Sequence, residues 1–462
     1  MIRIDVLPDD VLLEIFDSYT NTLLPFRSQP DIDAWKTLVH VCQRWRNLVL
    51  GSPRRLNLRL FCTQKTPARD KLDVWPALPL IIKGNVAESP GTDNIIAALR
   101  QSNRVREVYL SDLSDLHLEE VLAPMQVSFP ELTDLQLFAT DDTPSAIPDS
   151  FLGGSAPRLR SVTLYNIPFP GLPNLLLSST HLIELTLDDI PDTGYISPEA
   201  MVALLSASPS LKMLTIEFES PQYRPGREGR SLPPLKRPIL PALAKFHYKG
   251  VTEYLEDLVA FIDAPQLNLF SIIFFTQIDY DTRRLVQFIN RTPKLWKRDA
   301  HVQFYEGFAR FKLRDGFRIL EITIPSIEPD QQLSSIEQVC NSSLHPVSMV
   351  ENLYISHRYW QRVWKGDAIE NTLWLQLFLP FTVVKTLYLS KEFAPGIAGA
   401  LEELVGDRIT EALPSLQNIF VEGPKPSGSF QENIGQFVAA RQLSGQPVAI
   451  SVWDKYSNVT PA

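Results

Sequence analysis

The sequence predicts a mixed α/β protein, with a small helical module at its start and a solenoid of repeated strand–helix units after it. Three observations lead to this prediction. Two short amphipathic segments lie near the start of the chain, before position 50. A leucine-rich pattern, L-x-x-L-x-L, then recurs at nearly regular intervals. Between its copies lie stretches with the apolar spacing of short helices.

The first amphipathic segment starts at Pro8, because proline is tolerated in the first turn of a helix. Asp9 and Asp10 follow it and place negative charge at the positive end of the helix dipole. Apolar residues then recur at helical spacing and form one face. These residues are Val11, Leu12, Ile15, Phe16 and Tyr19.

A second segment, from residue 38 to residue 49, also carries an apolar face. Two or three helices of this length cannot bury all of their apolar surface against one another. The surplus must therefore meet the rest of the chain or a partner. The residues on this face are Leu38, Val41, Cys42, Trp45, Leu48 and Val49.

These two segments resemble the F-box family, whose pattern is a Leu-Pro before a short amphipathic helix, then Val-Cys-x-x-Trp-x-x-Leu. Here the pattern is Leu7-Pro8 and then Val41-Cys42-Gln43-Arg44-Trp45-Arg46-Asn47-Leu48, in about an eighth of the chain. The connection Thr20–Asp33 is longer than the family's usual one. The resemblance implies that residues 1–55 bind a Skp-type adaptor and, through it, a cullin. The implied adaptor-binding residues are Leu7, Pro8, Val11, Leu12, Ile15, Phe16, Leu38, Val41, Cys42, Trp45 and Leu48.

The rest of the chain, residues 76–462, repeats the pattern L-x-x-L-x-L. The first five copies end at Leu110, Leu137, Leu164, Leu187 and Ile216. Steps of this length, within the range of roughly 20–29 residues, are the signature of a leucine-rich repeat. Each copy supplies one strand that is too short to be stable alone, so neighbouring copies must stack. We therefore expect an irregular leucine-rich-repeat solenoid with the shape of a horseshoe or an arc.

The second half of the repeat is less regular. Later copies end at Ile322, Ile355, Leu389 and Val421, at steps longer than the usual leucine-rich range, and the segment Leu295–Phe304 fits the pattern poorly. An ordinary α/β domain with leucine-rich strands by coincidence is the alternative. We expect residues 56–75 to link the helical module to the solenoid. The proline-rich stretch 221–238 is expected to be a long exposed loop.

Composition narrows the class of partner and of compartment. The chain has 462 residues, a formal net charge of −9 and a pI of about 5.4, which argues against nucleic acid or an anionic membrane as the main partner. Its three cysteines are far apart, without a CxxC pair. No signal-peptide pattern and no apolar run long enough to span a membrane occurs. We expect a cytoplasmic or nuclear protein, or one found in both compartments.

The sequence carries no recognisable catalytic pattern. The chain lacks a phosphate-binding Gly-rich loop and a G-x-S-x-G nucleophile elbow, and its seven histidines never pair at metal-ligand spacing. We therefore expect no enzyme activity, no cofactor and no metal. An unrecognised hydrolase, assembled from distant residues, stays open.

The expected substrate surface follows from strand geometry. In L-x-x-L-x-L the leucines enter the core, and the residues between them face outward on the concave side. Aromatic residues are favoured as anchors in protein interfaces. In the alternative interpretation, helices or loops cover some of these residues. The candidates are Tyr109, Gln136, Phe138, Tyr165, Glu184, Asp188, Tyr354, Tyr388 and Phe420.

The resemblance implies a substrate-recognition subunit of a cullin-type (SCF) ubiquitin ligase, as in F-box proteins of the fungal type with an irregular leucine-rich repeat. The helical module would bind the adaptor, and the solenoid would bind an unknown protein substrate. The alternative is a leucine-rich-repeat scaffold without catalytic activity. In that protein the N-terminal helices would cap the solenoid and would not join a ligase.

Overall fold

The chain folds into two compact units, Met1–Ile196 and Ser197–Ala462. Both are mixed α/β and each contains a mainly parallel sheet, as expected for a leucine-rich-repeat-like fold. The computed structural model describes residues 7–21, 34–65, 68–86, 91–141, 145–169, 174–221, 237–275, 282–341, 346–357, 369–404, 406–423 and 429–453. Within these ranges, no helix combines the length and the apolar character that crossing a bilayer requires.

The N-terminal unit begins with three helices, α1 (Asp9–Asn21), α2 (Ala34–Val39) and α3 (Gln43–Gly51). The second amphipathic segment is thus two helices. Cys42 lies in extended backbone conformation between them, and its Sγ accepts a hydrogen bond from the Trp45 amide, as an N-cap of α3. The Arg44 guanidinium donates to the Asp9 carboxylate and to the Leu7 carbonyl, both at 2.6 Å, and joins the starts of α1 and α3.

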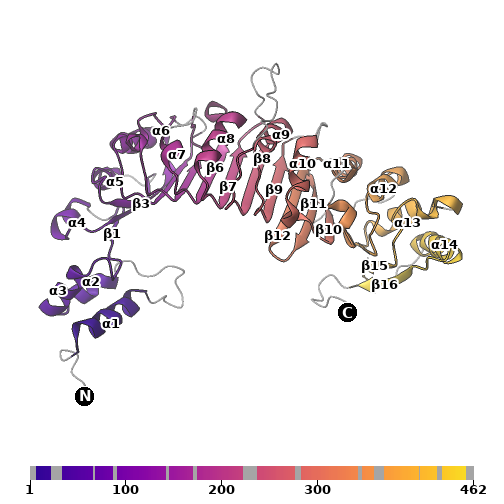
Figure 1. Ribbon diagram of the computed structural model, residues 1–462, viewed down its shortest axis with the longest axis horizontal. Coiled ribbons are helices and arrows are strands. Elements are labelled where there is room, and N and C mark those ends of the chain that lie inside the picture. Colours follow the sequence, from indigo (N-terminus) through magenta and orange to yellow (C-terminus); the bar gives the residue numbers. More distant parts are fainter. Residues whose placement is uncertain are drawn as a thin grey trace. The chain divides into compact units, whose positions relative to one another are not determined.

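Within the described ranges of the N-terminal unit, six parallel strands form a sheet in chain order. Leucine and valine side chains of β4 and β5 are buried at alternate positions, as the L-x-x-L-x-L pattern predicts. Helices and 3₁₀ turns connect the strands, and the helices α5, α6 and α7 lie on one side of the sheet (Figure 1). The strands are β1 (Leu60–Cys62), β2 (Leu80–Asn85), β3 (Val105–Leu113), β4 (Asp134–Ala139), β5 (Ser161–Tyr165) and β6 (Glu184–Ile190). The connecting helices are α4 (Ala68–Val74), α5 (Thr92–Leu99), α6 (Asp115–Leu122) and α7 (Asn174–Ser178), with 3₁₀ turns η2 (Pro124–Gln126), η3 (Phe151–Gly154) and η4 (Asp192–Gly194).

The segment 56–75, which we expected to be a linker, is instead part of the fold. It carries β1 and α4, and β1 pairs with β2 in parallel. Leu56 and Leu58 just before β1 are buried. The polar composition of this segment hid its strand, because one short edge strand has too few residues for a periodic signal.

In the described residues of the C-terminal unit, ten strands form a sheet in the order β7-β8-β9-β12-β11-β10-β13-β14-β15-β16. All neighbours pair in parallel except β10 with β11 and β11 with β12. The strands are β7 (Met213–Phe218), β8 (Lys245–Gly250), β9 (Leu269–Phe274), β10 (Asp299–Phe304), β11 (Phe308–Asp315), β12 (Arg318–Pro325), β13 (Asn352–His357), β14 (Thr386–Leu389), β15 (Asn418–Glu422) and β16 (Ala449–Trp453). The helices are α8 (Pro198–Ala207), α9 (Thr252–Ala260), α10 (Arg283–Asn290), α11 (Pro329–Asn341), α12 (Asn371–Phe378), α13 (Ala394–Glu402) and α14 (Ser429–Leu443), with 3₁₀ turns η5 (Pro293–Leu295), η6 (Val347–Met349) and η8 (Gly406–Thr410).

An antiparallel insertion explains why the repeat pattern weakens after β9. The chain crosses to β10, returns through β11 and turns again into β12, which lies beside β9. Gly316, at φ +57°, provides the left-handed residue of the tight turn between β11 and β12. The segment 295–304 fitted the repeat poorly because it leads into this insertion: its strand, β10, is followed by β11, and the two pair in antiparallel. The proline-rich stretch 221–238 lies mostly outside the described residues.

Two buried charged side chains stabilise connections in the C-terminal unit. The Glu256 carboxylate accepts hydrogen bonds from the Arg284 and Leu285 amides, at 2.9 and 2.8 Å, where α10 begins. The Arg441 guanidinium is fully buried and donates to the Leu413 carbonyl at 2.6 Å and to the Pro414 carbonyl at 3.3 Å. The Glu256 carboxylate binds amides that the first turn of α10 leaves without partners, and the Arg441 guanidinium binds carbonyls of the segment before β15.

Candidate functional site

The first helix carries an exposed apolar stripe. Val11, Ile15 and Tyr19 are 42%, 47% and 47% exposed, and their i, i+4 spacing places them on one face of α1. We call these three residues the α1 stripe. Val41, between α2 and α3, is 56% exposed. Apolar surface therefore remains open on the helical module, as its small size led us to expect.

The predicted adaptor-binding residues divide into three groups by burial. Leu12, Phe16 and Leu38 are buried and form the core of the module, where the Phe16 ring packs on Trp45 with centroids 4.7 Å apart. These three side chains support the surface residues above them and are not accessible to a partner. The half-buried residues are Leu7, Trp45 and Leu48. The exposed residues are Pro8, Val11, Ile15, Val41 and Cys42.

A different residue, Trp35 of α2, attaches the module to the repeat. Its side chain is buried, its Nε1–H donates to the Arg59 carbonyl at 3.0 Å, and its ring meets Trp75 edge-on at 5.0 Å. Sequence reasoning missed both tryptophans. The spacing of Trp35, Leu38 and Val39 is helical and was the available signal. The attachment leaves the α1 stripe exposed.

The outward residues of β3, β4 and β5 form a row of three aromatic side chains. Tyr109 and Phe138 have ring centroids 5.4 Å apart, and Phe138 and Tyr165 have centroids 6.1 Å apart. We call Tyr109, Phe138 and Tyr165 the N-terminal aromatic row. The structure thus brings together three candidates that lie on three successive copies of the repeat.

Polar candidates lie beside this row in the same registers. Gln136 is the strand partner of Tyr109, and Asp188 is the strand partner of Tyr165. Glu184 pairs with Ser161 nearer the start of the strands. The six candidates of this unit therefore share one face across β3 to β6, where aromatic anchors have polar neighbours.

The candidates of the C-terminal unit form a tighter stack. The ring of Tyr354 lies 4.3 Å from that of Tyr388, and Tyr388 lies 5.0 Å from Phe420, all close to parallel. His301 extends the stack at 4.4 Å from Tyr354, and Trp453 lies 5.1 Å from Tyr388. Because the rings cover one another's faces, the stack offers ring edges and hydroxyl groups to a ligand. Burial, and next the phenol of Tyr388, raise the pKa of Tyr354 above its usual range.

His301 and Trp453 were missed because their strands were missed. His301 lies on β10, inside the antiparallel insertion, and Trp453 ends β16. Neither strand carries a recognisable L-x-x-L-x-L copy. Among the described residues, no group of three or more histidine, cysteine or carboxylate side chains is arranged to hold a metal.

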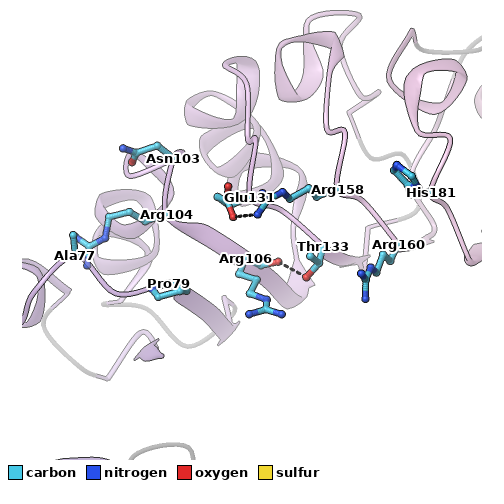
Figure 2. Close-up of a pocket in the computed structure, with 10 residues that line it drawn as sticks. All are labelled: Ala77, Pro79, Asn103, Arg104, Arg106, Glu131, Thr133, Arg158, Arg160 and His181. Atoms are coloured by element: carbon cyan, nitrogen blue, oxygen red, sulfur yellow. Dashed lines mark hydrogen bonds and ion pairs between the residues drawn. The ribbon is translucent and has the colours of Figure 1, made fainter. Parts of the chain in front are cut away.

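A basic pocket lies in the N-terminal unit, where the strands begin (Figure 2). Its volume is about 560 Å³. Four arginines and one glutamate carry its formal charge, and His181 is neutral in this sum. The lining residues are Ala77, Pro79, Asn103, Arg104, Arg106, Glu131, Thr133, Arg158, Arg160 and His181. Sequence reasoning missed this pocket, although Arg104-Val105-Arg106 and Arg158-Leu159-Arg160 repeat one Arg-x-Arg pattern.

The chain is similar to known proteins in structure, but no sequence match was found. No protein-family model matches the sequence, and no curated protein matches it. Among solved structures, the chain is similar to the leucine-rich repeat-containing protein LegL7 from Legionella pneumophila, at 12% identity and a TM-score of 0.28. The match covers 85% of this chain and 99% of that one.

Proposed function

We propose that this chain is a non-catalytic substrate receptor of a cullin-type ubiquitin ligase. The N-terminal helices would bind a Skp-type adaptor, and the open faces of the repeat would bind a protein substrate. The receptor would accelerate ubiquitin transfer by raising the effective concentration of the substrate near the transferring enzyme. It would act in the cytoplasm or the nucleus.

The exposed α1 stripe is the observation that supports adaptor binding. Burying a Val or Ile side chain fully contributes roughly 1.5–3 kcal/mol, so a side chain that is about half exposed would add roughly 1 kcal/mol when covered. Val11, Ile15 and Tyr19 together would then supply several kcal/mol to a complex. The buried residues beneath them, such as Phe16, fix the position of the stripe.

The aromatic groups of the two units support the substrate-binding part of the proposal. Tyr109, Phe138 and Tyr165 combine large apolar area with few rotatable bonds, which lowers the entropy lost on binding. The stack at Tyr354 and Tyr388 is held in place by its own ring contacts. Either group can hold a polypeptide without rearranging.

Capture of a purified Skp-type adaptor by the full chain tests the proposal. A Val11→Asp, Ile15→Asp double variant should lose capture at least tenfold, because each carboxylate would have to be desolvated at the contact. Leu116→Asp is the matched control, since Leu116 is 74% exposed on α6 and makes the same chemical change elsewhere in this unit. Equal retention of wild type, double variant and control, or no capture by wild type, would refute the proposal.

One observation favours the scaffold alternative, in which the helices only cap the repeat. Trp35 is buried and bonded to Arg59 next to β1, as a capping helix would be. The capping contact and the α1 stripe use different residues, so adaptor capture separates the two functions. A scaffold would keep the Trp35 contact and capture no adaptor.

A further inference from the structure

Two arginines on alternate repeat strands, one in β3 and one just before β5, have no protein partner. Within the described part of the chain, the guanidinium groups of Arg106 and Arg160 make no hydrogen bond and no ion pair. Figure 2 shows both groups pointing to the same side of the sheet, with Thr133 between their strands. The other charged residues that line the pocket bind protein groups: Arg104 donates to backbone carbonyls, and Arg158 pairs with Glu131.

Backbone hydrogen bonds fix the spacing of this pair. The Thr133 amide donates to the Arg106 carbonyl and the Arg160 amide donates to the Thr133 carbonyl, both at 2.8 Å. Arg106 and Arg160 therefore lie two strands apart, which is roughly 10 Å between their backbones. Arginine side chains are long enough to bring both guanidiniums onto one doubly charged group across that span.

The neighbouring ionisable groups leave this pair positive. Glu131 is bonded to Arg158, and Glu107, next to Arg106, is bonded to Arg59 at 2.5 Å. Asp134 accepts a hydrogen bond from the Thr133 hydroxyl at 2.6 Å and keeps its negative charge, which the positive charge of Arg104 offsets. Arg104 donates to the Leu78 and Pro76 carbonyls and shapes the wall of the pocket.

We propose that Arg106 and Arg160 form a binding site for the phosphoryl group of a ligand. The guanidinium fork matches the geometry of phosphate oxygens, and two forks neutralise its two negative charges. A pocket of about 560 Å³ has room for a ligand that extends beyond one phosphoryl group.

This proposal deepens the proposed function by naming the chemistry that the repeat binds, and it does not depend on the adaptor. A phosphorylated side chain of a polypeptide and a small phosphate ester share this chemistry. Adaptor capture reports on α1, whereas phosphate binding reports on β3 to β5, so one proposal can fail while the other stands.

Titration calorimetry of the full chain in phosphate-free buffer provides the test. The probes are sodium pyrophosphate, phosphoserine, and a phosphoserine peptide with its unphosphorylated twin. Wild type should bind the phosphorylated probes, and an Arg106→Gln, Arg160→Gln double variant should bind them at least tenfold more weakly. Lys391→Gln, which removes an exposed charge after β14, is the matched control and should bind as wild type does.

A gain-of-binding variant protects the test against misfolding. Glu131→Gln removes the acidic residue of the described pocket lining and releases Arg158, so the phosphorylated probes should bind severalfold more tightly. Tighter binding of the peptide than of phosphoserine would assign the source to a phosphorylated polypeptide, and equal binding would assign it to a small ester. No binding by wild type, or equal binding by wild type and the double variant, would overturn the proposal.

Discussion

Replacing Trp35 is expected to detach the N-terminal helices while the repeat of the same unit stays folded. Trp35 is 2% exposed, and its contacts to the Arg59 carbonyl and the Trp75 ring join α2 to the segment around β1. The core of the helical module, where Phe16 packs on Trp45, does not use it. The substitution therefore acts on the attachment and leaves both parts intact.

The magnitude follows from two substitutions of graded severity. Trp35→Phe keeps a ring but removes the indole donor of the 3.0 Å hydrogen bond, which should cost about 1 kcal/mol. Trp35→Ala also leaves a cavity at a buried site and should cost about 3–5 kcal/mol. A double-mutant cycle with Trp75→Ala should return a coupling energy of about 0.5–1.5 kcal/mol for the edge-on ring pair.

Hydrogen exchange measured by mass spectrometry resolves where this free energy is lost. Peptides from α2 should exchange faster in the order wild type, Trp35→Phe, Trp35→Ala, whereas peptides from β4 and β5 should keep their protection. Unchanged exchange in α2 would show that Trp35 does not hold the module. Equal loss of protection in β4 and β5 would show that module and repeat unfold as one cooperative unit.

Three further predictions concern single side chains. In the native protein a thiol reagent should label Cys42 quickly, because it is exposed, and should label the buried Cys62 and Cys340 only after denaturation, which a colorimetric thiol count checks. The raised pKa of Tyr354 means that the folded state keeps a proton that the unfolded chain loses above its usual value of about 10. Its contribution is complete below that pH and declines above it, so the urea midpoint of wild type should fall more steeply at alkaline pH than that of Tyr354→Phe. Arg441→Met should lower the free energy of unfolding by about 3 kcal/mol, because two backbone carbonyls lose a charged donor. Removing the buried charge offsets only part of this loss. An unchanged urea midpoint would contradict this prediction.

The repeat strands were predictable because one face of each is buried. Leu135 and Leu137 of β4 occupy buried positions in strict alternation with outward ones, and this alternation is visible in the sequence. The N-terminal aromatic row followed from the same period, since a residue between two buried leucines must face outward. Local rules also account for the start of α8, where the Ser197 hydroxyl accepts a hydrogen bond from the Ala200 amide.

Features that depend on strand pairing were not predictable from one sequence. β10 and β11 pair in antiparallel inside a parallel sheet, and no local pattern marks that change of direction. His301 joins the stack at Tyr354 only because β10 lies beside β13. The pocket at Arg106 and Arg160 arises in the same way, from residues that are far apart in sequence and two strands apart in space.

For the predicted adaptor-binding residues, the sequence did not show which side chains are buried and which are exposed. Leu12 and Ile15 have similar hydrophobicity and lie on the same helix, yet Leu12 is buried and Ile15 is about half exposed. Periodicity identifies an apolar face, but it does not show which part of that face the neighbouring helices cover. That division depends on how α2 and α3 pack on α1.

Calorimetric titration of a purified Skp-type adaptor into the full chain measures directly whether the α1 stripe binds an adaptor. We expect saturable binding with a negative heat-capacity change, because the α1 stripe leaves water when the complex forms. The heat of binding should disappear in the Val11→Asp, Ile15→Asp variant and persist in Leu116→Asp. Absence of binding by wild type, or binding that both variants leave unchanged, would contradict the claim that these apolar side chains serve another molecule.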